Sequence, residues 1–73
     1  MPLVELFKSS PEEAGKEEPR GMGLLQMSMN SFMLPLNIRV IQVNGPYVSQ
    51  LPPEREGLPV REVYTANIVY TIT

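Results

Sequence analysis

The stretch VREVYTANIVYTIT, Val60 to Thr73, carries the clearest structural pattern of this chain. It is rich in the β-branched and aromatic residues that strands favour, and its apolar side chains alternate with polar ones. One face is expected to hold Val60, Tyr64, Ala66, Ile68, Tyr70 and Ile72, with Glu62 as its polar exception. The pattern predicts a long C-terminal strand over residues 60–73. Since no residue follows it, we expect its pairing partners upstream or in another subunit.

Two further strands are expected before it. In LLQMSMN, Leu25, Met27 and Met29 alternate with polar residues, which is the periodicity of a strand. Residues 36–43 are rich in Ile and Val and predict a second strand. Its alternation slips at Val40-Ile41, which indicates either burial on both faces or a β-bulge at that point.

The dipeptide Asn44-Gly45 is a strong hairpin signal, but Pro46 follows it directly. Proline has no N–H to close the hairpin, and it pushes the preceding residue towards extended backbone angles. We therefore expect a redirecting corner at residues 44–46, with residues 47–51 leaving the strand at an angle. A return of the chain through a longer loop is the alternative.

The N-terminal part, residues 1–23, holds eight of the fourteen charged residues and several Pro and Gly residues. This composition predicts an extended arm. Ser10, Pro11 and Glu13 form a helix-start pattern, which leaves room for one short helix near residues 11–18. The apolar cluster from Leu3 to Phe7 is expected to dock on another surface. The predicted fold is therefore all-β: a small antiparallel sheet or open barrel of 3–4 strands (residues 24–73), with an extended N-terminal arm and a Pro-rich loop at 51–59.

Composition excludes several classes of function. The 73 residues include no Cys, no His and no Asp, so disulfides, the usual zinc and haem ligands and EF-hand loops are all missing. The net charge of −2 argues against a nucleic-acid partner, and the uncharged run 21–38 is too polar to span a membrane. The N-terminus lacks a basic lead, so we expect no signal peptide and a soluble protein. A chain this short is marginally stable alone, so association is the expected aid.

No catalytic, cofactor-binding or metal-binding residues are predicted. Nucleophilic triads need His, and the paired Glu residues lie in the arm. Glu62 is the one unusual carboxylate, and we expect it at a strand end or paired with Arg61 or Arg39. The Pro-rich loop either stiffens a connection or is recognised as a polyproline segment. The methionines of residues 22–33 either fill a core or form an adaptable contact surface.

Together, the apolar-tipped arm, the stretch 24–53 with Arg39 as its single charge, and the long terminal strand resemble the small cement or decoration proteins of tailed-phage capsids. The resemblance covers the overall design and includes no diagnostic motif. It implies a non-enzymatic protein of the virion that bridges major capsid subunits, with contacts between its own copies. From the residues, we expect the edge of the strand at 60–73 to pair with a partner by β-augmentation and the arm to reach a second neighbour. The alternatives are a free-standing β module that acts as a regulator or inhibitor, and a cytoplasmic accessory subunit of a cellular complex. The expected partner-binding residues are Leu3, Val4, Leu6, Phe7, Met27, Met29, Phe32, Met33, Tyr64, Ile68, Tyr70 and Ile72.

Overall fold

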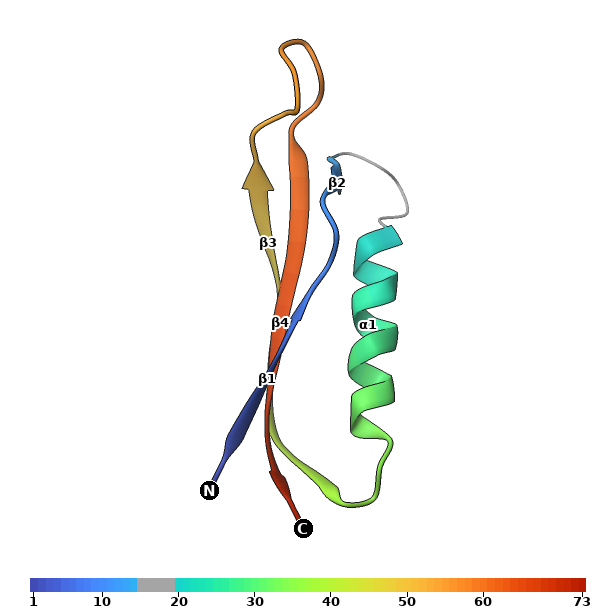
Figure 1. Ribbon diagram of the computed structural model, residues 1–73, viewed down its shortest axis with the longest axis vertical. Helices are drawn as coiled ribbons and strands as arrows, with labels where there is room; N and C mark the ends of the chain where they lie inside the picture. Colours follow the sequence, from blue (N-terminus) through green and yellow to red (C-terminus); the bar gives the residue numbers. More distant parts are fainter. Residues whose placement is uncertain (15–19) are drawn as a thin grey trace.

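The computed structural model describes residues 1–14 and 20–73 and is elongated, with principal extents of 51 × 21 × 13 Å. Its strands are β1 (Leu3–Lys8), β2 (Glu12–Glu13), β3 (Ile38–Leu51) and β4 (Arg61–Ile72), and its helix is α1 (Arg20–Met33). Figure 1 shows the helix lying along one side of the sheet. The small open antiparallel sheet confirms the predicted fold class, mainly β.

Strand β4 is the centre of the sheet. β1 pairs with it from Leu3↔Tyr70 to Lys8↔Thr65, and β2 continues along the same edge opposite residues 61–62. β3 pairs with the other edge, from Ile38↔Ile72 to Leu51↔Arg61. The long terminal strand is therefore confirmed. The expectation that its edge is offered to a partner is wrong, because β1, β2 and β3 occupy both edges.

The first predicted strand, around residues 25–30, is wrong: these residues belong to α1. Leu25 and Met29, four residues apart, point to the sheet, while Met27 is exposed. Residues 20–33 contain no β-branched residue, and Leu, Met and Gln are good helix formers. The helix ends shortly before Pro35, as expected from the restriction that proline places on the residue before it.

The second predicted strand exists and is longer than expected, because β3 continues to Leu51. The predicted bulge at Val40-Ile41 is confirmed, since Val40 and Gln42 lie opposite consecutive residues of β4. The corner expected at residues 44–46 is wrong. A second bulge between Asn44 and Tyr47 takes up the extra residue, with Gly45 at φ 102°, and strands tolerate proline at bulges. The chain reverses after Leu51, in the predicted Pro-rich loop.

The N-terminal segment is part of the sheet. The apolar tip does dock, and the surface that it meets is the chain's own strand β4. Instead of the short helix expected near residues 11–18, the chain forms strand β2 at Glu12–Glu13, and residues 15–19 lie outside the described residues.

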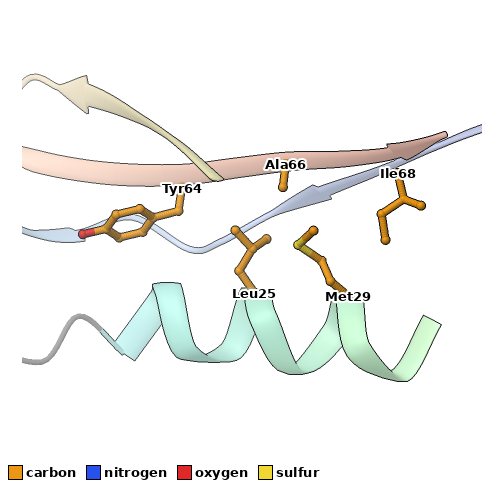
Figure 2. Close-up of a cluster of buried hydrophobic side chains, with 5 residues drawn as sticks. All are labelled: Leu25, Met29, Tyr64, Ala66 and Ile68. Atoms are coloured by element: carbon orange, nitrogen blue, oxygen red, sulfur yellow. The ribbon is translucent and has the colours of Figure 1, made fainter. Parts of the chain in front are cut away.

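The core lies between α1 and one face of the sheet. Figure 2 shows its buried members, which are Leu25, Met29, Tyr64, Ala66 and Ile68. Around them, the ring of Phe32 makes edge contacts with Phe7 (centroids 5.6 Å apart) and with Tyr70 (4.9 Å). Such edge-to-face pairs add specific geometry to the burial of apolar area. The chain therefore forms this core without a second subunit.

Candidate interaction surface

The twelve expected partner-binding residues divide into two groups. Seven serve the chain's own core: Met29, Tyr64 and Ile68 are buried, and Phe7, Phe32, Met33 and Tyr70 pack against them. The exposed ones are Leu3, Val4, Leu6, Met27 and Ile72. Helix α1 explains part of this division, because it turns Met29, Phe32 and Met33 towards the sheet. Only the exposed group remains available to a partner in this fold.

The face of the sheet turned away from α1 is largely uncovered. Residues directly opposite in an antiparallel pair share a face, and neighbours along a strand alternate between faces. The register therefore places the partners of Thr65, Asn67 and Val69 on the face opposite Tyr64, Ala66 and Ile68. We define the open face as Val4, Leu6, Lys8, Gln42, Asn44, Tyr47, Thr65, Asn67 and Val69.

The open face combines apolar side chains with a short chain of amides. Val4 (57% exposed), Leu6 (77%) and Tyr47 (55%) present apolar area to solvent. A hollow of about 260 Å³ runs between β1 and β3, lined by Leu6, Phe7, Lys8, Tyr47, Thr65, Ala66 and Asn67. Gln42 Nε2 donates a hydrogen bond to Asn44 Oδ1 (2.8 Å), and Asn44 Nδ2 donates one to Asn67 Oδ1 (2.8 Å). These two bonds fix the three amides relative to one another. A surface of this kind suits contact with another protein.

Strand β3 is the most exposed strand of the sheet. Val40, Ile41, Val43, Tyr47 and Val48 all expose more than a third of their surface, and Arg39 is the strand's one charged residue. Within the described residues, no strand pairs with its outer edge. Sequence reasoning missed this edge. The available signal was a long, apolar strand with one charge and two bulge-forming sites.

A shallow groove separates α1 from β3. Its volume is about 340 Å³, and it is lined by Gln26, Met29, Asn30, Met33, Val43, Gly45 and Pro46. The groove exists because the helix packs over β4, so part of the same face of β3 stays uncovered. Its lining is apolar and amide in character, without a charged group.

Several charged side chains cluster near the β3–β4 loop and strand β2, away from the groove beside α1. A hollow of about 290 Å³ there is lined by Pro11, Glu12, Glu13, Glu54, Leu58, Pro59 and Arg61. Arg61 Nη1 lies 3.6 Å from Glu54 Oε1, and its Nε donates to the carbonyl of Pro52 (3.2 Å). Glu62 is the second residue of β4, so its expected place at a strand end is confirmed, and Arg61 pairs with Glu54 instead of Glu62. Glu62 accepts a hydrogen bond from the Tyr64 hydroxyl (2.9 Å), which raises the pKa of that phenol.

Residues 1–14 and 20–73 contain no group of three side chains placed to hold a metal ion. In the same residues, no helix is long and apolar enough to cross a membrane.

Comparison with known proteins returned no match among family models, curated proteins or solved structures.

Proposed function

We propose that this chain is a non-enzymatic structural protein that stabilises a larger protein assembly. The observation that carries the proposal is the pair of uncovered surfaces, the open face and strand β3, which together expose large apolar side chains. Monomeric soluble proteins rarely leave a contiguous apolar patch of more than a few hundred Å² in water. A protein partner is the natural cover for a surface that mixes apolar groups with amides.

The use of the carboxylates supports a non-catalytic role. Glu12 accepts two hydrogen bonds from the backbone N–H of Gly21, Glu62 accepts from Tyr64, and Glu54 pairs with Arg61. Each of these groups therefore has a structural partner. With no His, Cys or Asp in the sequence, the chain has few side chains suited to acid–base or nucleophilic work.

The specific form of the proposal is a capsid cement protein that bridges major capsid subunits in the virion. In this form the contact is made by the body of the protein. The expected clasp by a free arm is set aside, because β1 is paired with β4. An accessory role in a cytoplasmic complex uses the same surfaces and differs in the identity of the partner.

A second candidate is a free-standing binding module that acts as a regulator or inhibitor. It is favoured by one observation: β4 has partners on both edges within the chain, and the core forms without a second chain. A module of this kind would use the open face for one soluble target.

Site-specific photo-crosslinking tests the proposal. A photoreactive phenylalanine analogue replaces Leu6 on the open face, and in a control variant it replaces Ser28, which is exposed on α1. Both variants are produced in the native source and irradiated, and the adducts are separated by sedimentation and identified by mass spectrometry. We expect the Leu6 variant alone to crosslink to a subunit of a large particle. An adduct with one soluble protein supports the second candidate, and equal labelling from both positions overturns both.

A further inference from the structure

Strand β3 has the features of a pairing edge for a strand of matching shape. Fourteen residues long, it carries one charge and is exposed along nearly its whole length. Long, apolar edges of this kind tend to pair with another strand. Bulges normally discourage such pairing, because they bend the strand and increase its twist. A strand that bends at the same places avoids that mismatch.

The two bulges of β3 are arranged symmetrically. One extra residue lies at Ile41, and the other lies between Asn44 and Tyr47, at Gly45-Pro46. Val43 is midway between Ile41 and Gly45. A two-fold axis through Val43 therefore places the first bulge of one copy opposite the second bulge of the other. We propose that two copies of this chain pair antiparallel through the outer edges of β3, centred on Val43.

The side chains agree with this register. Arg39 of one copy lies opposite Tyr47 of the other, both on the side of the sheet away from α1, where a cation can rest on the phenol ring. On the helix side, Ile38 lies opposite Val48 of the second copy, and Val43 lies opposite Val43. Arg39, the single charged residue of β3, thus lies opposite an aromatic ring of the second copy and not opposite the second Arg39. Both helices then cover the same side of one continuous sheet.

The exposed area is of the right size for such an interface. The chain exposes 5493 Å², whereas a compact monomer of 8.2 kDa is expected to expose about 4,500 Å². The excess of about 1,000 Å² belongs to the whole elongated chain, and it is large enough to include the roughly 800 Å² that each partner buries in a standard protein interface. Pairing through β3 also extends the apolar groove beside Val43 across the two-fold axis.

The partner in this proposal is a second copy of the chain, and the proposed binding of a larger assembly does not depend on this pairing.

Sedimentation equilibrium of the purified full chain tests the pairing of two copies. We expect wild-type protein to sediment with twice the 8.2 kDa chain mass at micromolar concentration. Val43→Lys should raise the dimer dissociation constant by about tenfold or more, because it sets two like charges directly opposite. The matched control is Val4→Lys, on the opposite edge of the sheet and similarly exposed, and it should leave the constant unchanged.

A second variant keeps the proposal testable if the lysine disturbs folding. The chain has no cysteine, so Val43→Cys introduces a single thiol at the two-fold axis. Under mild oxidation we expect a disulfide-linked dimer from Val43→Cys and none from Val4→Cys, because directly opposite residues are close enough to bridge. A wild-type protein that is still monomeric at about 100 μM overturns the proposal, because its dimer dissociation constant would then be too high for pairing at micromolar concentration. Crosslinking through position 4 instead of position 43 overturns it as well.

Discussion

Ser9 and Tyr64 exchange hydrogen bonds across the point where β1 ends and β2 has not yet begun. The N–H of Ser9 donates to the carbonyl of Tyr64 (2.9 Å), and the N–H of Tyr64 donates to Ser9 Oγ (2.8 Å). The hydroxyl takes the place of a backbone carbonyl and carries the pairing of β4 past the break between the two short strands. Both backbone hydrogen-bonding groups of Tyr64, whose ring is buried, therefore have a partner at this break in the edge of β4.

Replacing Ser9 by Ala should destabilise the protein by about 1–2 kcal/mol, because the N–H of Tyr64 then lacks its acceptor in a half-buried site. Ser10→Ala is the matched control, since Ser10 is exposed, and its effect should stay within about 0.5 kcal/mol. Urea unfolding followed by circular dichroism measures both. Equal stability of the two variants would show that the Ser9 hydroxyl does not support β4.

The two glycines of α1 should respond to alanine in opposite directions. A Cβ on Gly21 would lie 3.2 Å from both Cβ and Oγ of Ser9, so Gly21→Ala should lower the free energy of unfolding by about 1 kcal/mol or more despite its better helix propensity. A Cβ on Gly23 meets no atom within 4 Å. Gly23→Ala should therefore raise the free energy of unfolding by about 0.5–1 kcal/mol. Thermal unfolding of the pair reads out the sign, and stabilisation by both would contradict the close packing of Ser9 on the helix.

Gly45 is required by the second bulge of β3. It has φ 102°, and a Cβ there would lie 2.9 Å from the carbonyl oxygen of Thr65. We expect Gly45→Ala to cost at least about 2 kcal/mol, from backbone strain and this contact together. Gly57 has φ 87° in open space, so Gly57→Ala should cost only the strain, about 1 kcal/mol. Denaturant unfolding compares them, and a smaller cost at Gly45 than at Gly57 would argue against the bulge.

The hydrogen bond between Tyr64 and Glu62 should appear in the pH dependence of stability. It raises the pKa of the Tyr64 phenol above its ordinary value of 10.0. Because the folded-state pKa is higher than the unfolded one, the contribution is fully present below pH 10 and is lost as the pH rises through the folded-state pKa. Wild-type protein should therefore lose stability above pH 10 more steeply than Tyr64→Phe, which keeps the ring. Parallel curves from pH 9 to 12 would contradict this bond.

The local pattern of the sequence predicted the strands with strong alternation. Residues 60–73 combine β-branched and aromatic residues with period two, and the slip at Val40-Ile41 is a direct sign of a bulge. The helix was missed because Leu25, Met27 and Met29 satisfy period two, while Met22, Leu25, Met29 and Phe32 also satisfy the helical period. The lack of β-branched residues in 20–33 was the signal that separates the two.

The pairing of distant segments could not be predicted in the same way. Leu3 lies opposite Tyr70, and nothing in either local stretch specifies that contact. For this reason the strand at 60–73 was expected to offer an edge to a partner, and the apolar tip of the arm was expected to dock on another surface. The exposed surface of β3 follows from that same pairing, so the candidate site depends on contacts between residues far apart in sequence.

The central claim is that another protein covers the exposed side of this fold, where β3 and the open face lie, while β4 is held within the chain. Hydrogen–deuterium exchange, measured on the isolated dilute chain and on the assembly purified from the native source, tests it most directly. We predict slow exchange for the β4 amides in both samples. The β3 amides that face outward, away from β4, should exchange quickly in the isolated chain and slowly in the assembly, whereas those that donate to β4 should exchange slowly in both. Rapid exchange of β4 in the isolated chain, or equal exchange of the outward-facing β3 amides in both samples, would contradict the account.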